Sequence, residues 1–359
     1  MPAPHRPRHH LDEPRPTTVP ERVDALWRGP WFPTVLAGLA LVVWLVSIPF
    51  VRVSAIDGWG LLSGLPLGWY AAYAITTVAL LVGLGSATSS SLGAIRFRLV
   101  RSKQWVPAFA VLVIILFATT ALVYDAPRYP WTYKHIGVTE YLILHGAPAP
   151  DLDIYQNFPG FFYIMGLLHE LTRIPLLLMA RWSEVVTMAV NAVVVYWTMG
   201  ALTRSARERA VTVVLFTLSN WIGQTYFAPQ ALAFPVGMLV IGVFLRLLAA
   251  GHGRPATSAA ILVAEPTQRH AAHAPGHTSF WSRPGAVLLC VGLFAVIVVS
   301  HQFTPVAVLL QLGLLVVIFR ARRPWLLVVC AIVEGLWVLT TLPYLTAHFS
   351  LLEKTKFDN

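Results

Sequence analysis

The reactive side chains of this sequence are concentrated in residues 124–160, a polar stretch between strongly apolar segments. The stretch holds the carboxylates of Asp125, Glu140, Asp151 and Asp153 together with aromatic residues, histidines and a lysine. Asp125 directly follows an apolar segment, where a lone carboxylate is costly unless water solvates it or a reaction employs it. A catalytic role and a solvated position at a helix end are therefore both open for this residue. Asp153 has the alternative role of ordering its loop.

Within this stretch, residues 133–145 are predicted to form a short helix lying at the membrane interface. The prolines before it end the preceding helix, and Gly146 with the prolines that follow ends it. An ammonium, a phenol and an imidazole on one helix face suit a phosphate at headgroup level, and simple contact with lipid headgroups is the alternative. At spacings of four, seven and eleven, the predicted face consists of Lys134, Val138, Tyr141 and His145. Glu140 points away from it.

The elements around this stretch are those of a membrane protein. Hydrophobic residues make up 57% of the 359 residues and charged residues only 12%, well outside the composition of soluble domains. Apolar segments of about 20 residues recur, each long enough to cross a hydrocarbon layer of roughly 30 Å. The sequence therefore predicts an all-α polytopic membrane protein with about nine transmembrane helices. The predicted spans are 31–53, 67–85, 105–124, 182–202, 210–227, 232–250, 286–300, 305–319 and 325–345.

The segment 158–181 is apolar enough for a further span, but His169, Glu170, Arg173 and Pro175 interrupt it. If it does not cross the membrane, most lysines and arginines fall on one side, as the positive-inside rule requires. We therefore expect an interfacial or re-entrant segment and a large external loop, 125–181. Composition together with this rule predicts a disordered cytoplasmic tail at 1–30, a transmembrane domain at 31–346 and a cytoplasmic low-complexity loop at 251–284. An external tail, 347–359, ends the chain, which is compatible with a truncated or split product.

This topology places two further polar motifs on the outer face, 219–230 and 300–305. Their aromatic residues could form a wall for a sugar ring or an isoprenoid, and their amides suit sugar hydroxyls. Hydrogen bonding between helices is the alternative role for the amides, and capping of the next helix is the alternative for the histidine. The candidate binding residues of these motifs are Asn220, Trp221, Gln224, Tyr226, Gln230, His301 and Gln302.

Several other classes of function are disfavoured. The net charge of +10 comes from short basic runs beside apolar segments, which is a topology signal and gives no support to nucleic-acid binding. Cys290 and Cys330 both lie in apolar segments, so a structural disulfide is not expected. The histidines of the loop 251–284 match no metal-ligand spacing. No nucleotide-binding or serine-nucleophile motif is present.

The motifs DIYQNFPGFF, NWIGQTYFAPQ and SHQFTP, after an acid-bearing external loop, resemble multi-spanning actinobacterial membrane proteins of the GT-C glycosyltransferase superfamily. These relatives are largely uncharacterised, and the resemblance covers most of 124–305. It implies a GT-C-like fold and transfer of a sugar from a polyprenyl-phosphate donor outside the cytoplasm, in cell-envelope glycan assembly. The implied partners are that donor, a glycan or lipid acceptor and membrane lipids.

In that superfamily a carboxylate of the first external loop acts on the acceptor. The resemblance carries this role to Asp125, with Glu140 and Asp153 as competitors. A carboxylate is a suitable base for an attacking hydroxyl, and cations such as Arg128, Lys134 or His301 suit the leaving phosphate. Further candidates for substrate binding are Tyr155 and Asn157. No cofactor is indicated with certainty, although a divalent cation is compatible with the reaction.

Two other functions fit the same sequence. A transporter or flippase would bind a lipid-linked or polar solute with the same outer residues and catalyse nothing, but transporters usually carry polar residues at mid-membrane and on both faces. Here the predicted helices are nearly free of charge, with Glu334 the main exception. The second of these functions is that of a structural subunit of a cell-envelope complex.

Overall fold

The computed structural model describes residues 31–85, 104–220, 225–251, 284–318 and 324–348. These residues are mostly helical and contain no β-strand. The prediction of an all-α chain is therefore confirmed for the part of the molecule that the structure describes.

Six helical segments are long and apolar enough to cross a membrane. They are Phe32–Phe50 (α2, Phe32–Ser47, with a 3₁₀ turn), α3 (Leu67–Leu84), Trp105–Val123 (α4, Trp105–Val113, through α5, Thr119–Val123), α8 (Leu176–Met199), Pro229–Leu248 of α10 (Pro229–Gly251) and α13 (Trp325–His348). Two shorter apolar helices accompany them, α11 (Pro284–Val298) and α12 (Thr304–Ile318). The chain is a membrane protein.

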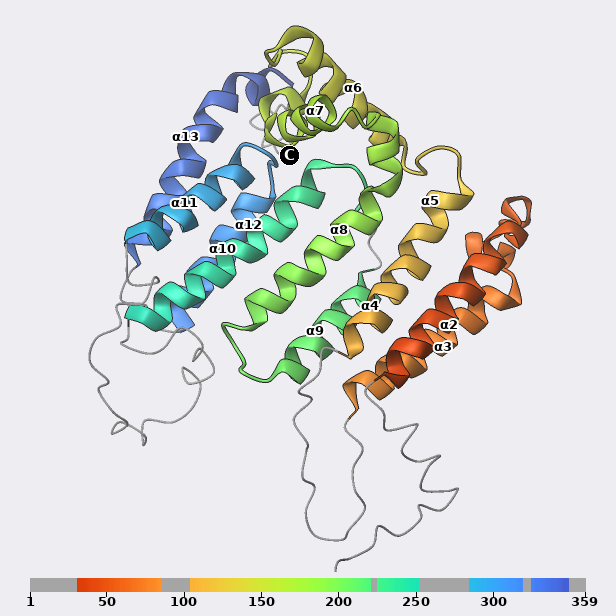
Figure 1. The fold of residues 1–359 in the computed structure, drawn as a ribbon. Coiled ribbons are helices and arrows are strands. Elements are labelled where there is room, and N and C mark those ends of the chain that lie inside the picture. The colour runs from red at the N-terminus through yellow and green to blue at the C-terminus, as the bar shows by residue number, and fades with distance from the viewer. Residues whose placement is uncertain (1–30, 86–103, 221–224, 252–283, 319–323, 349–359) are drawn as a thin grey trace, which may run out of the picture.

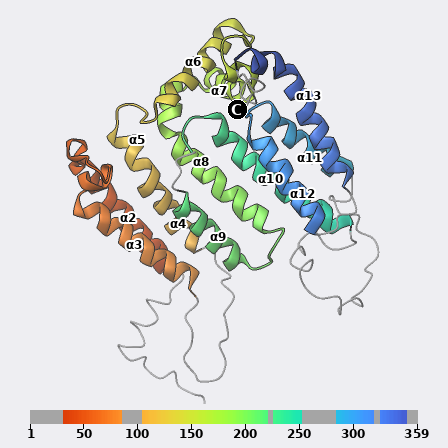
Figure 2. The ribbon, with the colours of Figure 1, turned by 180° about the vertical axis from the view of Figure 1, so that it is seen from behind.

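The long helices pack in two groups that meet where α8 contacts α10. In the first group, buried side chains of α2, α3, α4, α8 and α9 (Ala206–Ser219) form one apolar core. In the second, α10, α11, α12 and α13 form another. The helices α6 (Pro130–His145) and α7 (Gly160–Thr172) cover one end of the bundle, as Figures 1 and 2 show from opposite sides. A third apolar core, which includes Val138, Phe162 and Phe227, attaches this cover to the bundle.

A π-helical turn, Ile114–Ala118, joins α4 to α5 and sets the orientation of the threonines that follow it. The Thr119 hydroxyl accepts hydrogen bonds from the buried indole nitrogens of Trp44 and Trp69, both at 2.9 Å. It donates to the carbonyl oxygen of Ile115 at 2.6 Å. One hydroxyl thus connects α2, α3 and α5, and the next residue, Thr120, faces α8.

The segment 158–181 consists of α7 and the first turns of α8. Arg173 ends α7 in the left-handed conformation, with φ of 58°, and Pro175 precedes α8. The expected interruption at Pro175 is therefore present. The predicted start of the following span, at residue 182, is wrong by six residues, because the helix already begins at Leu176.

The predicted span 210–227 is wrong at its end, because α9 ends at Ser219. The Ser219 hydroxyl bonds back to the carbonyl oxygen of Phe216, and Asn220 leaves the helix with ψ of 66°. Short polar side chains compete for backbone hydrogen bonds in this way and favour helix ends. The 14 residues of α9 reach about 21 Å at 1.5 Å per residue. Phe227 lies in the irregular segment before α10.

The interfacial helix predicted at 133–145 is α6, which begins three residues earlier, at Pro130. Proline suits the first turn of a helix because its missing N–H has no helical partner there. The helix ends at Gly146, whose φ of 72° favours glycine. Both ends of α6 thus follow from local sequence.

Candidate functional site

The three polar motifs of the sequence meet at the end of the bundle that α6 and α7 cover. His135 Nδ1 of α6 lies 2.8 Å from the carbonyl oxygen of Phe227, which belongs to the second motif. The backbone N–H of Gly160 donates to the carbonyl oxygen of Val299 at 2.8 Å, next to the third motif. A Cβ on Gly160 would lie 2.5 Å from the Ser300 hydroxyl, so this close approach requires glycine. Figure 1 shows the turns before α10 and before α12 beneath α6 and α7.

His135 is the buried centre of this junction. Its ring is fully shielded from solvent and contacts the rings of Tyr155, at 4.9 Å between centroids, and Tyr226, at 5.9 Å. Because a carbonyl oxygen can only accept, Nδ1 carries the proton of the neutral ring. The other ring nitrogen, Nε2, is buried without a hydrogen-bond partner in the described part of the chain. Burial lowers the pKa of His135, which keeps the ring neutral.

A polar cavity of about 20 Å³ lies beside this junction, between the α5–α6 connection and the first turns of α8. Two donors in its lining are buried and have no partner among the described residues: the Thr132 hydroxyl and Nε of Arg181. Nη2 of Arg181 donates to the carbonyl oxygen of Ala121 at 2.7 Å. We call this space the polar cavity. Its lining residues are Thr120, Ala121, Tyr124, Ala126, Pro127, Arg128, Tyr129, Thr132, Ala180, Arg181, Glu184 and Tyr226.

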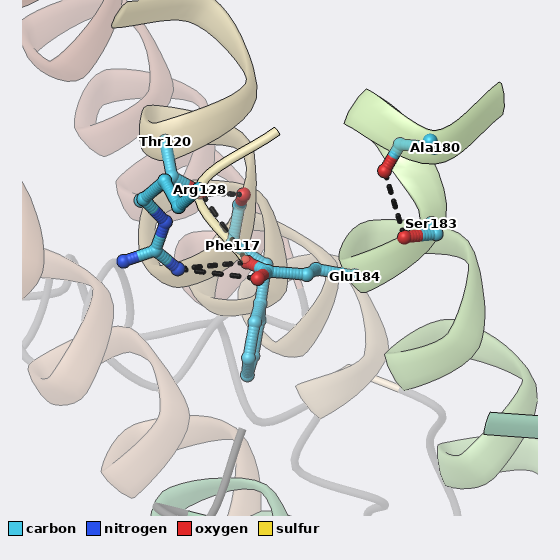
Figure 3. A network of polar contacts seen from close by, with 6 residues as sticks. All are labelled: Phe117, Thr120, Arg128, Ala180, Ser183 and Glu184. Atoms are coloured by element: carbon cyan, nitrogen blue, oxygen red, sulfur yellow. Dashed lines mark hydrogen bonds and ion pairs between the residues drawn. The ribbon is translucent and has the colours of Figure 1, made fainter. Parts of the chain in front are cut away.

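An ion pair closes one side of the polar cavity. Nη2 of Arg128 lies 3.1 Å and 3.3 Å from the two carboxylate oxygens of Glu184. The Thr120 hydroxyl lies 3.3 Å from the same carboxylate and 3.0 Å from the carbonyl oxygen of Phe117, and its one proton can go to either acceptor. Figure 3 shows Arg128 and Thr120 both directed at Glu184, which projects from α8. The Glu184 side chain is only 14% exposed, against 37% for Arg128. Burial and the Glu184 charge raise the pKa of the neighbouring Tyr129 phenol.

A much larger apolar groove of about 490 Å³ runs between α7, α8 and α10. On α8 it extends from Leu178 to Val190, about 18 Å along the helix axis. Its volume lies in the range of pockets that hold small organic ligands. Tyr226 lines both this apolar groove and the polar cavity, so the two spaces adjoin at that side chain. The remaining lining residues are Phe161, Met165, Leu168, Ile174, Met179, Trp182, Ser183, Val186, Thr187, Phe227, Ala231, Leu232 and Pro235.

The three acids predicted as catalytic lie outside both spaces. Asp125 and Glu140 are exposed, and neither lines the polar cavity or the apolar groove. Asp153 pairs with Nζ of Lys134 at 2.5 Å and accepts from the backbone N–H of Tyr155 at 2.9 Å. Asp153 thus has the loop-ordering contacts that were its alternative role.

The other predicted residues of the first motif divide into two groups. Arg128 lines the polar cavity, and Tyr155 packs on His135. The rest lie elsewhere: Asn157 is buried and donates to the carbonyl oxygen of Pro150 at 2.8 Å, and Tyr141 and His145 stack on each other at 4.0 Å. Val138, predicted on the same face as Lys134, packs in the apolar core.

In the second and third motifs, Tyr226 lies at the centre of the site, and Gln230 donates to its hydroxyl at 3.1 Å. His301 Nδ1 lies 2.9 Å from the Thr304 hydroxyl and accepts from the Thr304 backbone N–H at 3.2 Å, so it caps α12. Burial, followed by the nearby His135, lowers the pKa of His301 to about 4. Asn220 Nδ2 and Gln302 Oε1 are buried without partners within the described ranges. Trp221 and Gln224 lie outside the described residues.

Sequence reasoning missed four residues of this site: Thr132, His135, Arg181 and Glu184. The signal for Glu184 was an acid close to the start of a predicted membrane span, a position where ionisable residues are rare. Thr132 and His135 are spaced three residues apart on α6, but the face that was singled out was the one carrying Lys134. Nothing in the sequence indicated that α6 buries the other face.

The described residues contain no group of three or more histidine, cysteine, aspartate or glutamate side chains that could hold a metal ion. Cys290 and Cys330 are both buried and free. Comparisons of the chain with family models, with curated proteins and with solved structures find no match. The geometry of the site is therefore the basis for its interpretation.

Proposed function

We propose that this chain is a membrane glycosyltransferase of the GT-C type that takes its sugar from a polyprenyl-phosphate donor. The observation that supports this most is the junction at Tyr226, where a polar, cation-bearing cavity adjoins an apolar groove within the helices. A lipid-linked sugar needs these two environments side by side: an apolar surface for its chain and charged donors for its phosphate. In this proposal the isoprenoid chain of the lipid lies in the apolar groove and its phosphate lies in the polar cavity.

The proposed topology has nine spans, with the N-terminus in the cytoplasm and the site on the extracytoplasmic face, where envelope glycans are assembled. In addition to the six long helices, α9, α11 and α12 cross the membrane in this arrangement. The α8–α9 turn, which precedes Arg207 and Arg209, lies at the end of α8 opposite the site, and arginines favour the cytoplasmic side. A Ser205→Cys variant should react with a membrane-impermeant maleimide only after the membrane is opened; labelling of intact cells contradicts this orientation.

The transfer reaction itself has a direct assay. Membranes that contain the protein should transfer radiolabelled sugar from a polyprenyl-phosphate donor, and control membranes should not. Among Asp125→Asn, Glu140→Gln and Asp153→Asn, a large loss of turnover with retained expression identifies the base. Absence of transfer with every polyprenyl-phosphate sugar tested contradicts the enzyme proposal.

A lipid-binding protein without catalysis, such as a flippase, is the second candidate. The position of the acids favours this candidate. Glu184 is the one carboxylate that lines the polar cavity, and it is paired with Arg128 and so is not a free base. Movement of a fluorescent polyprenyl phosphate across the bilayer of proteoliposomes, without chemical change, distinguishes it from a transferase.

A further inference from the structure

We propose that Glu184 and the phosphate of an isoprenyl phosphate compete for Arg128, so that the lipid binds by exchanging one anion for another. The proposal rests on the lipid site described above, but it concerns how that site admits its ligand and does not require a transfer reaction. The Arg128–Glu184 ion pair, which joins the α5–α6 connection to α8, then closes the polar cavity until the ligand separates the pair.

The first support is the charge of the polar cavity. Two arginines, Arg128 and Arg181, line it, and Glu184 is the only carboxylate among its lining residues. One positive charge in the lining is therefore left without a negative partner in the lining. A phosphate monoester carries close to two negative charges at neutral pH. Once Arg128 leaves Glu184, the two arginines together carry the charge that such a phosphate needs, while the Glu184 carboxylate remains in the lining and opposes binding.

The second support is the set of unused hydrogen-bond donors. Thr132 is 1% exposed, yet its hydroxyl has no partner among the described residues, and the same holds for Nε of Arg181. Buried donors are rarely left unpaired, since an unmade hydrogen bond leaves the cost of removing the donor from water uncompensated. Glu184 pairs instead with Arg128 and lies within hydrogen-bond distance of Thr120, whose hydroxyl also bonds to the carbonyl oxygen of Phe117. A phosphate offers three acceptor oxygens and could satisfy donors that Glu184 does not reach.

The third support is size. The polar cavity of about 20 Å³ has room for roughly one water molecule. A phosphate is larger, so it fits only if the Arg128–Glu184 pair parts. Arg128 is the more exposed partner, at 37% against 14%, and it projects from an irregular connection, so the proposal assigns the movement to Arg128 and leaves Glu184 in place on α8. Figure 3 shows that the two side chains approach from these different elements.

The fourth support identifies the ligand as a single-chain lipid. In the part of the chain that the structure describes, the polar cavity adjoins the apolar groove at Tyr226. An isoprenyl phosphate has one chain attached directly to its phosphate, and so matches one groove that meets one polar cavity. A diacyl phospholipid would have to place its second chain outside this groove.

The experiment measures binding of farnesyl phosphate to the purified protein in lipid nanodiscs. Farnesol, inorganic phosphate and phosphatidic acid are compared with it, to separate the contributions of the phosphate, the chain and the diacyl alternative. Glu184→Gln should bind farnesyl phosphate more tightly, by about two- to fivefold, because it removes the competing anion of a partly exposed pair. Arg181→Gln should weaken binding by about tenfold or more, since charge-assisted hydrogen bonds are lost.

The matched control is Glu170→Gln, which removes the acid of the exposed Glu170–Arg173 pair at the end of α7; neither residue of this pair lines the polar cavity or the apolar groove. It should leave binding unchanged. Thermal unfolding of every variant checks its folding, and Glu184→Asp, which keeps the anion, should bind like the unsubstituted protein. Weaker or unchanged binding by a folded Glu184→Gln variant overturns the proposal, as does equal binding of farnesol. Tighter binding of phosphatidic acid overturns the assignment to a single-chain lipid. Tighter binding by Glu184→Gln without any sugar transfer upholds this inference and contradicts only the enzyme proposal.

Discussion

Replacing Thr119 by valine should destabilise the packing of α2, α3 and α5 without changing the shape of the side chain. Valine keeps the volume of threonine but cannot accept the hydrogen bonds from the indole nitrogens of Trp44 and Trp69. Thr119, Trp44 and Trp69 are buried, with exposed fractions of 2%, 3% and 7%, so water cannot replace the lost acceptor. Two buried donors would then be left unpaired.

The size of the effect follows from these two hydrogen bonds. In membrane proteins a side-chain hydrogen bond between helices contributes about 0.6 kcal/mol on average and up to about 1.7 kcal/mol. Loss of both should therefore lower the free energy of unfolding by about 1–3 kcal/mol. The third contact of the hydroxyl, to the carbonyl oxygen of Ile115, lies within the same helical segment and does not join separate helices.

The assay is thermal unfolding of the protein in nanodiscs, followed by intrinsic tryptophan fluorescence. Thr76→Val is the matched control, because Thr76 is fully buried on α3 but bonds only to the carbonyl oxygen of Ala72 in its own helix. Thr119→Ser, which keeps the hydroxyl, should recover most of the loss. If Thr119→Val is no less stable than Thr76→Val, the hydroxyl does not hold the three helices together and the reasoning is refuted.

Three further predictions concern the covered end of the bundle. Gly160→Ala should lower the free energy of unfolding by about 1–3 kcal/mol, because its Cβ would lie 2.5 Å from the Ser300 hydroxyl. Gly137→Ala on α6 meets no atom within 4 Å and should be neutral or stabilising. Thermal unfolding of both variants checks this, and equal effects would contradict it. Because the pKa of His301 is lowered to about 4, the native state keeps this ring neutral, and stability should fall as the pH drops from about 6.5 towards 4. The fall in unfolding temperature should be smaller in His301→Asn, and an unchanged pH profile would exclude His301 as its source. Asp153→Asn keeps the oxygen that caps the turn and should lower the free energy of unfolding by less than about 1 kcal/mol. Asp153→Ala loses the cap as well and should lower it more. The same unfolding assay ranks the two variants, and the reverse order would contradict the capping role.

Local sequence was sufficient to predict the elements of the covered end. Helix α6 lies where prolines, a periodic segment and Gly146 indicated it, because these signals act within a few residues. The break before Pro175 was predicted for the same reason. Hydropathy also identified the long helices, since crossing a membrane imposes length and composition on each one separately.

The site could not be predicted in the same way, because its contacts join residues far apart in the chain. Arg128 and Glu184 are 56 positions apart, and His135 and Phe227 are 92 apart. Which acid of several lines the polar cavity depends on how α6 and α8 pack. The sequence therefore favoured Asp125, by its position at a helix end, over Glu184, which lies within a helix. The end of α9 was missed because Ser219 and Asn220 end it before the apolar pattern stops.

The central claim is that the apolar groove and the polar cavity bind one isoprenyl phosphate. The most direct measurement is photo-crosslinking of the protein in nanodiscs with a farnesyl phosphate that carries a benzophenone on its chain, followed by peptide mapping. We predict labelling of α7, α8 and α10 at the residues of the apolar groove, such as Met165, Met179 and Leu232, with competition by farnesyl phosphate but not by farnesol. Labelling confined to the exposed apolar faces of α12 and α13, or labelling that farnesyl phosphate does not reduce, would contradict the claim.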